Sequence, residues 1–414
     1  IIVNTCGFIG AAKKESYDVL TELVANKQDG QLLIAAGCLT QRYGAEVVEK
    51  VPGIDGILGT RRWMDIVDVV TKLRRRTHPE PLYHLPEDAT VGTDEGGILR
   101  VAHQGPSAYI KIADGCRRPC AFCAIPLIKG TAVSRPMESI IAEARVLEAE
   151  GVREIILIAQ DSTDYGHDLG MKNGLAELME QLVYAAPDID WIRLLYAYPG
   201  YVTDELIDVM AAHKQLIPYL DMPLQHAHPQ TLKRMRRPAN MDWVHRTLEN
   251  MRKVMPDLAL RTTFIVGYPG ETDEEFQTLL DFVEDIRFDR VGAFTFSYEP
   301  GTTSEPLGDP VSEELKLERQ ERLMTLQQHI SLENNQALVG KTLDVLIEGH
   351  GEVDDSQEPI AVGRTYRDAP EIDGMVIVEG QPPIGEIVPV RINGAMTYDL
   401  TGVVETNEPL IIVG

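Results

Sequence analysis

Apolar runs of strand length alternate with segments of helical periodicity through most of the chain. The first two runs are "IIVNTCGFI" (1–9) and "QLLIAAGCL" (31–39), and the segment between them has helical spacing. This alternation predicts an N-terminal α/β domain over residues 1–75. Residues 76–106 are polar and rich in Pro and Gly, which predicts a linker.

A longer series of the same units begins at residue 107. The predicted strands are "AYIKIAD", "EIILIAQD", "WIRLLYAYP", "IPYLDMPL", "LRTTFIVGYPG" and "RVGAFTFSYEP". Helical spacing follows most of them, at 136–150, 174–185, 203–213, 242–255 and 272–285, and a long helix is expected over 312–338. Repeated βα units predict a parallel sheet curled into a full or partial barrel over 107–338. Ligands then bind at the carboxyl ends of the strands.

Residues 339–414 have a different pattern, with five short apolar runs separated by turn residues. This pattern predicts a small, five-stranded, all-β barrel. The fold class is therefore α/β, with an N-terminal α/β domain, a βα barrel and a small C-terminal β-barrel.

Composition and charge narrow the class of protein. The sequence contains no run of eighteen apolar residues and no signal peptide. We therefore expect a cytoplasmic protein and not a membrane protein. The five cysteines are too few and too clustered for a disulfide framework. The net charge is −25, and residues 341–414 hold four Lys/Arg against fourteen Asp/Glu. Such a chain suits a basic partner better than a phosphate backbone.

Three of the five cysteines lie in "ADGCRRPCAFCAIP" (113–126), as Cys116, Cys120 and Cys123. Their spacing is C-x3-C-x2-C, whereas zinc sites usually combine C-x2-C pairs and need four ligands. Three thiolates suit a cubane iron–sulfur cluster with one iron left open. Structural zinc and plain core cysteines remain as alternatives.

Because the triplet follows the first strand of a βα repeat, the chain resembles the radical S-adenosylmethionine (radical SAM) enzymes. The resemblance implies that the open iron of a [4Fe–4S] cluster chelates S-adenosylmethionine. Cleavage of the cofactor then gives a 5′-deoxyadenosyl radical that abstracts hydrogen from an unactivated carbon. The residue before the last cysteine, here Phe122, is implied to lie near the cofactor.

The same resemblance implies further cofactor contacts. "TFIVGYPGET" (263–272), with Gly267, resembles the strand that contacts the adenine, although it also reads as a buried strand and a Pro-Gly turn. Gln160 and Asp161 end the second strand, near the expected position of the cofactor amino group. Arg261 could pair with the methionyl carboxylate or with a buried acid. Gln225 ends "DMPLQ" and is a further candidate contact.

The other two cysteines, Cys6 in "VNTCGFI" and Cys38 in "GCLTQRYG", each end a predicted strand. Beside the triplet they resemble the second and third cysteine motifs of the methylthiotransferases, which join an N-terminal α/β domain, a radical SAM domain and a TRAM-type barrel. The resemblance implies a second [4Fe–4S] cluster for sulfur delivery. The family's first cysteine lies upstream, and the opening "IIVNTCGF" reads as mid-strand, so we expect a missing N-terminal piece and an incomplete auxiliary site.

Two stretches narrow the resemblance to the RimO-type branch, "IPYLDMPLQHAHPQTLKRMRRP" and "DAPEIDGMVIVEG" (368–380). That branch methylthiolates the β-carbon of an aspartate in small-subunit ribosomal protein twelve, which implies this basic partner and an electron donor. The acidic barrel agrees, because a tRNA enzyme should carry a basic track. The alternatives are a tRNA adenosine methylthiotransferase and a zinc-stabilised, non-catalytic RNA-binding protein.

Overall fold

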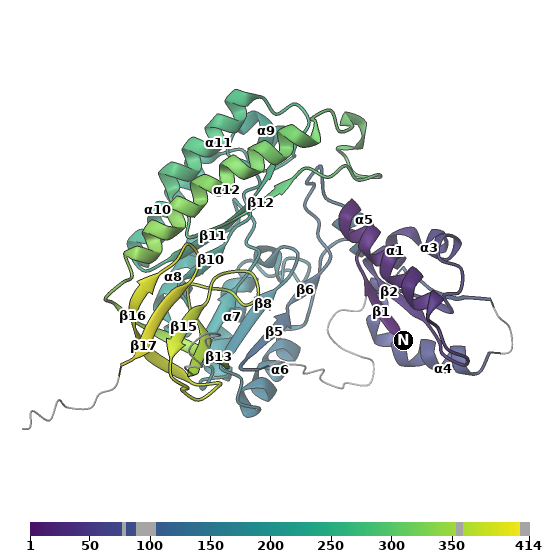
Figure 1. Cartoon of the computed structure of the whole chain (residues 1–414), viewed down its shortest axis with the longest axis horizontal. Helices are drawn as coiled ribbons and strands as arrows, with labels where there is room; N and C mark the ends of the chain where they lie inside the picture. Colours follow the sequence, from purple (N-terminus) through teal and green to yellow (C-terminus); the bar gives the residue numbers. More distant parts are fainter. Residues whose placement is uncertain (77–79, 88–104, 353–358, 406–414) are drawn as a thin grey trace, which may run out of the picture.

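The computed structural model describes residues 1–76, 80–87, 105–352 and 359–405 (Figure 1). Much of the predicted linker, and the last nine residues of the predicted C-terminal barrel, lie outside these ranges. No helix in the described ranges is long and apolar enough to cross a bilayer.

The N-terminal domain is a four-stranded parallel sheet in the order β1-β2-β3-β4, packed against helices. Its core contains Leu20, Leu39 and Ile57, which are completely buried. The elements are β1 (Ile2–Thr5), α1 (Gly10–Ala25), β2 (Ile34–Gly37), α2 (Cys38–Tyr43), α3 (Ala45–Lys50), β3 (Gly56–Gly59), a 3₁₀ helix η1 (Thr60–Asp65), α4 (Ile66–Arg74) and β4 (Leu82–His84).

Strand β4 lies in the segment that the sequence pattern predicts to be a linker, so that prediction is wrong for residues 82–84. The strand takes three of the four residues between Pro81 and Pro86, which is too short a run to be recognised as a strand. In the structure Leu82 pairs with Gly56, and the ring of His84 lies 2.6 Å from a carboxylate oxygen of Asp65. These tertiary contacts stabilise the strand.

The central domain is a partial barrel of parallel strands, as the βα repeat predicts. Two three-stranded sheets, β5-β8-β9 and β10-β11-β12, are joined by a parallel bridge between Ile192 and Leu216. The elements are β5 (Ser107–Lys111), β6 (Ala113–Asp114), α5 (Ile125–Lys129), β7 (Val133–Ser134), α6 (Met137–Ala149), β8 (Glu154–Ile158), η2 (Ser162–Asp164), α7 (Gly174–Ala185), β9 (Trp191–Leu194), α8 (Asp204–Ala212), β10 (Tyr219–Asp221), α9 (Pro229–Arg234), α10 (Met241–Val254), β11 (Ala259–Val266), α11 (Asp273–Ile286), β12 (Arg290–Thr295), η3 (Glu305–Leu307) and α12 (Glu313–Gln336).

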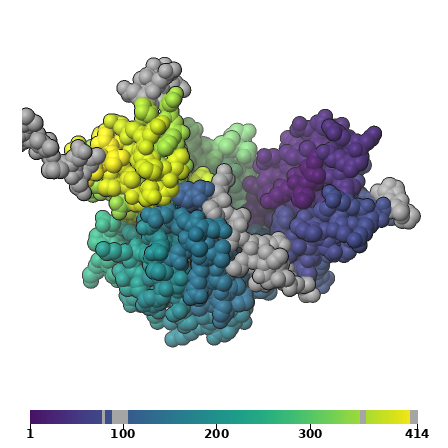
Figure 2. All heavy atoms as spheres, turned by 90° about the horizontal axis from the view of Figure 1, so that it is seen from below, coloured from purple at the N-terminus to yellow at the C-terminus, as the bar shows by residue number. Residues whose placement is uncertain are grey.

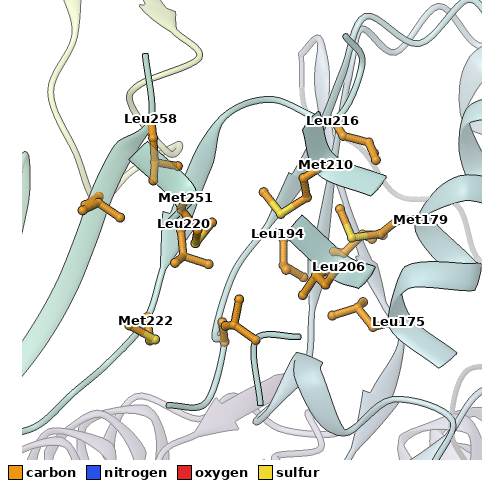
Figure 3. Close-up of a cluster of buried hydrophobic side chains, with 14 of the residues drawn as sticks. Leu175, Met179, Leu194, Leu206, Met210, Leu216, Leu220, Met222, Met251 and Leu258 are labelled. Carbon is orange, nitrogen blue, oxygen red and sulfur yellow. The ribbon is translucent and has the colours of Figure 1, made fainter. Parts of the chain in front are cut away.

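The core of this domain lies between the sheet and its outer helices. Figure 3 shows Met179 and Met210 from the helices pointing toward Leu194 of β9, while Met251 of α10 approaches Leu220 of β10. All of these side chains are at least 98% buried. The helix-facing sides of the strands are therefore filled by apolar packing, which leaves the concave face for other groups.

The C-terminal barrel is closed, in the strand order β13-β14-β15-β17-β16, as predicted. Its strands are β13 (Thr342–Glu352), β14 (Pro359–Thr365), β15 (Val376–Glu379), β16 (Ile387–Ala395) and β17 (Leu400–Val404). Alternate residues such as Val345, Ile347 and Val390 point inward and are completely buried.

The C-terminal barrel packs on the concave face of the central sheet, and Figure 2 shows it apart from the N-terminal domain. At this contact the fully buried Glu154 of β8 accepts hydrogen bonds from Arg193 of β9 and Arg364 of β14, each at 2.7 Å. Burial alone would raise the pKa of Glu154, but the two guanidinium groups outweigh it and lower the pKa below its usual value. The carboxylate therefore links the two domains.

We expect Glu154→Gln to destabilise the protein by about 3–5 kcal/mol, because it leaves the buried Arg193 without its counter-charge and removes one of the two carboxylates that pair with Arg364. Denaturant unfolding measures the loss, with the exposed Glu249→Gln on α10 as the control. The lowered pKa means that the stabilisation is complete above the unfolded glutamate's pKa, about 4.3, and declines as the pH falls through the lower folded value. A Glu154→Gln stability equal to that of the control at neutral pH would contradict this role.

Candidate functional site

The cysteine triplet lies on the loop between β6 and α5, where backbone hydrogen bonds hold both ends. The Cys116 N–H donates to the Gly130 carbonyl at 3.0 Å, and the Ala121 N–H donates to the Met235 carbonyl at 2.8 Å. None of the three cysteines forms a disulfide. All three line a single cavity of about 660 Å³ near the carboxyl ends of the central strands.

The cavity lining is positively charged, although the chain as a whole is strongly acidic. Lys111, Arg118, Arg237 and Arg261 line it, and no Asp or Glu does so within the described ranges. The remaining lining includes the three cysteines and aromatic side chains from all around the cavity, among them Phe8, Phe122, Tyr196, Tyr198 and Phe294. A cavity of this composition suits an anionic or carboxylate-bearing ligand.

Carboxylates behind the lining hold three of these cations. Lys111 lies 3.0 Å from Asp114, and Arg261 donates to Asp221 at 2.9 Å. Arg118 pairs with Asp161, with both side chains more than 90% buried, and its guanidinium stacks on Tyr198 and Tyr201. The cations are thereby fixed in place before any ligand binds.

Two arginines approach the cysteine sulfurs directly. The backbone N–H of Arg118 donates to Cys116 Sγ at 3.4 Å, and Arg237 Nη1 lies 3.5 Å from Cys120 Sγ. Burial raises the pKa of the Cys116 thiol to about 11 and that of the Cys123 thiol to about 12. Such thiols are poor nucleophiles at neutral pH, so the site does not favour covalent catalysis by these cysteines.

The three sulfurs do not converge on one point. Across the described residues, no three His, Cys, Asp or Glu side chains gather closely enough to hold a single metal ion. Thiolates that bind different corners of a cubane have no need to converge, whereas a tetrahedral zinc site requires it.

Two glutamines that the sequence indicates as cofactor contacts meet in this cavity. The Oε1 atoms of Gln160 and Gln225 are buried, and neither has a hydrogen-bond partner within the described part of the chain. Gln225 also has a left-handed backbone, with φ of 75°. Buried acceptors without partners are costly, so both oxygens are positioned to accept hydrogen bonds from a ligand. Phe122, also predicted, lines the same cavity.

The other three predicted cofactor contacts occupy different positions. Asp161 is buried behind Arg118 and does not line the cavity. Gly267 lies outside the lining as well, and a Cβ there would meet Lys316 Cγ at 2.4 Å. Arg261 lines the cavity and also pairs with the buried acids Asp221 and Asp373, the second of the two alternatives considered from sequence.

Cys6 and Cys38 lie on the same side of the central domain as the cysteine triplet. Cys6 and Cys38 follow the neighbouring strands β1 and β2, and their loops touch, since a Cβ on Gly7 would meet Leu39 Cα at 2.6 Å. Burial raises the pKa of Cys38, while Lys129 of α5 opposes that rise. Cys6 is exposed, and Phe8 reaches the cavity lining.

An ion pair fixes this arrangement between domains, and Figure 1 shows α5 beside the N-terminal domain. Arg42 Nη1 lies 2.8 Å from Glu299, with both side chains more than 90% buried, and Arg61 donates to the Ile128 carbonyl at 3.1 Å.

Several lining residues were not identified from the sequence. Arg237 and Tyr198 contact Cys120 from segments about 80 to 120 positions further along the chain, and nothing in the cysteine motif points to them. Ile372 comes from the C-terminal barrel. The sequence singles out the "DAPEIDG" stretch that contains Ile372, but the place of Ile372 in the cavity depends on how the domains pack.

Comparisons with known proteins agree with this architecture. Residues 110–283 match the model of the radical SAM superfamily, residues 339–404 that of the TRAM domain, and residues 1–59 that of the uncharacterized protein family UPF0004. Among solved structures, the radical SAM methyltransferase TsrM from Kitasatospora setae superposes with a TM-score of 0.55 at 16% identity. That match covers 73% of this chain and 62% of TsrM, and it supports the fold alone.

Curated relatives are much more similar. The ribosomal protein uS12 methylthiotransferase RimO of Chloroflexus aurantiacus is 49% identical, over 97% of this chain and 90% of that protein. The protein of the same name from Roseiflexus sp. is 46% identical, over 97% of this chain and 88% of its own length. Since the similarity spans all three domains, the chain belongs to the RimO family of radical SAM methylthiotransferases.

Proposed function

We propose that this enzyme methylthiolates the β-carbon of an aspartate in ribosomal protein uS12. One observation carries the proposal. Three cysteines, four cations and two unpartnered amide oxygens line a single cavity in a chain of the RimO family. An aspartate β C–H is too weakly acidic for ordinary general-base removal, so the reaction calls for a radical route, an external electron donor and S-adenosylmethionine.

Cys116, Cys120 and Cys123 would hold a [4Fe–4S] cluster with one iron open to S-adenosylmethionine. Their shared cavity and the absence of disulfides support this role. When bound, the cluster and cofactor supply an electron and a hydrogen-abstracting radical. Arg237 would donate a hydrogen bond to the Cys120 sulfur, which is one means by which proteins tune the potential of such clusters.

The polar lining would then orient the cofactor. The Gln160 and Gln225 amide oxygens would accept hydrogen bonds from its amino groups, and Phe122 would lie beside it. Asp161 would act through Arg118, which it holds. Gly267 does not line the cavity, so it would affect cofactor binding only through the turn that follows β11. Arg261 would bind a carboxylate.

Cys6 and Cys38 would be ligands of the auxiliary cluster implied for sulfur delivery. The touching loops of the two cysteines and the presence of Phe8 in the cavity lining support this role. The ion pair between Arg42 and Glu299 would keep the two cysteine groups on the same side of the molecule.

A tRNA substrate is less well supported. The C-terminal barrel is strongly acidic, with four Lys/Arg against fourteen Asp/Glu in residues 341–414, so it lacks the positive track that phosphate contacts require. An acidic surface would instead attract a basic ribosomal protein.

We expect Cys116→Ala, Cys120→Ala and Cys123→Ala each to reduce 5′-deoxyadenosine formation to background. The reason is that a cubane cluster without one of its thiolate ligands either loses an iron or has an altered reduction potential. Chromatography after anaerobic reconstitution with reductant measures the product, and unmodified enzyme is the control. Continued 5′-deoxyadenosine formation by the triple variant would show that the triplet does not carry the radical chemistry.

In a chain extended at its N-terminus to include the family's first cysteine, replacing Cys6 or Cys38 by Ala should abolish methylthiolation and leave 5′-deoxyadenosine formation largely intact, because the two cysteine groups have separate roles. Mass spectrometry of a uS12 peptide measures transfer, while the retained cofactor cleavage is the internal control for folding. A double variant that still methylthiolates the peptide would mean that these cysteines are only structural.

Binding of uS12 should weaken roughly tenfold as salt rises from low to several hundred millimolar, because screening shortens the range of the attraction. Fluorescence anisotropy measures it, and isolated tRNA should bind poorly even at low salt. Neutralising the exposed barrel residues Asp344 and Glu379 should weaken uS12 binding more than neutralising Glu249 and Glu284 on the outer helices. Tight tRNA binding would support the tRNA-modifying alternative.

A further inference from the structure

The C-terminal barrel supplies part of the cavity lining. The segment 368–374, between β14 and β15, lies against the central sheet. Its Ala369 is 1% exposed and packs there, while Ile372 is 47% exposed and lines the cavity.

The strand residues on the concave face show where the barrel's cover ends. On β11, Ala259 packs against the C-terminal barrel, and the next residues on the same face, Arg261 and Thr263, line the cavity. On β8, Ile156 packs in the interface and Ile158 lines the cavity. The barrel therefore forms a floor beneath the cavity, and Arg261 lies at its edge.

Asp373 connects this floor to Arg261. One of its carboxylate oxygens accepts hydrogen bonds from the Tyr219 hydroxyl at 2.6 Å and the Ala369 N–H at 2.9 Å, and the other lies 3.3 Å from Arg261 Nε. Asp221 accepts from Arg261 Nη1 on the opposite side. Two carboxylates, each at least 98% buried, thus fix one guanidinium.

The backbone around this point is held in unusual conformations. Glu371 has φ of 67°, a left-handed conformation that non-glycine residues rarely adopt, and it immediately precedes the exposed Ile372. Tyr196 and Gln225, both in the cavity lining, also have positive φ values. Such strain persists where surrounding contacts impose it, and it concentrates at functional sites.

Arg261 retains binding capacity despite its two partners. Its Nη2 has no hydrogen-bond partner among the described residues, and the side chain lines the cavity. It contacts none of the three cysteines, whereas Arg118 and Arg237 do. Since an arginine presents paired donors that match a carboxylate, Arg261 is available to an acid that enters above the barrel's floor.

We propose that Asp373 is a positioning residue through which the C-terminal barrel holds Arg261 to bind a carboxylate in the cavity. Under the proposed function, on which this inference rests, that carboxylate belongs either to the methionyl group of the cofactor or to the acidic side chain of the substrate. In both cases the barrel takes part in forming the site for the reaction.

Asp373→Asn tests the proposal, because asparagine keeps an oxygen acceptor for Tyr219 and Ala369 but loses the charge that orients Arg261. The matched control is Asp368→Asn. Asp368 is a second buried acid on the same segment, and it pairs with Arg290, the register partner of Arg261 on β12. Asp368 anchors the segment without touching a residue that lines the cavity.

Two affinities are measured on the reconstituted enzyme. The first is the affinity for S-adenosylmethionine, measured by equilibrium dialysis, and the second is the affinity for a labelled uS12 peptide. The same peptide with Asn in place of the target aspartate is the control for the second measurement. We expect Asp373→Asn to lower the affinity of the enzyme for one of these two ligands by about tenfold, as for loss of a charge-assisted hydrogen bond. Asp368→Asn should leave both affinities unchanged, and thermal unfolding of both variants reports any loss of stability.

The outcomes separate the possibilities. Weaker cofactor binding identifies the methionyl carboxylate. Weaker binding of the Asp peptide, with no change for the Asn peptide, identifies the substrate. If Asp373→Asn leaves both affinities within about twofold of the unmodified enzyme, or if Asp368→Asn weakens them equally, the positioning role is wrong. Failure to methylthiolate the peptide by an unmodified enzyme that also carries the family's first cysteine would instead contradict the proposed function, since these affinities do not depend on turnover.

Discussion

The buried carboxylate of Glu154 is a central polar link in the packing of the C-terminal barrel on the concave face of the central sheet. A buried ion is tolerable only with full compensation, and here Arg193 from the next strand and Arg364 from the barrel provide it. Apolar contacts are not directional, whereas the ion pairs that cross this contact, Glu154 with Arg364 and Arg290 with Asp368, help to fix the position of the barrel. That position places Ile372 and Asp373 beside the cavity, so the site depends on an interaction at the opposite end of the strands.

Much of the fold follows from the sequence because it is encoded locally. The periodicity at 272–285 predicts a helix, and the structure has one at Asp273–Ile286, which begins at a Thr272 capping box. The five apolar runs after residue 339 likewise form the closed barrel. Strand β4 was missed because its three residues are stabilised by a neighbouring strand and not by any pattern of their own.

The site was only partly predictable, for the same physical reason. The cysteine triplet and the glutamines at strand ends are visible because spacing and strand position are local properties. The partners of those residues are not. The proximity of Arg237 to Cys120, and of Asp373 to Arg261, arises from tertiary packing between segments more than 100 residues apart. The sequence could thus suggest that Arg261 meets a buried acid, but only tertiary packing identifies Asp221 on the neighbouring strand β10 and Asp373 in the C-terminal barrel.

The surface of the chain and the lining of its cavity carry opposite charges. The chain carries a net charge of −25, yet the cavity is lined by four cations and, within the described ranges, by no acid. An acidic exterior favours encounter with a basic protein, while a cationic interior favours the rare acidic side chain that such a protein presents. The acids that compensate the interior cations lie behind them, as Asp161 and Asp221 do, so they orient the guanidinium groups without occupying the face that a ligand would meet. Under the proposed function, long-range attraction would favour encounter with a basic protein, and the fixed cations of the cavity would favour an acidic side chain within it.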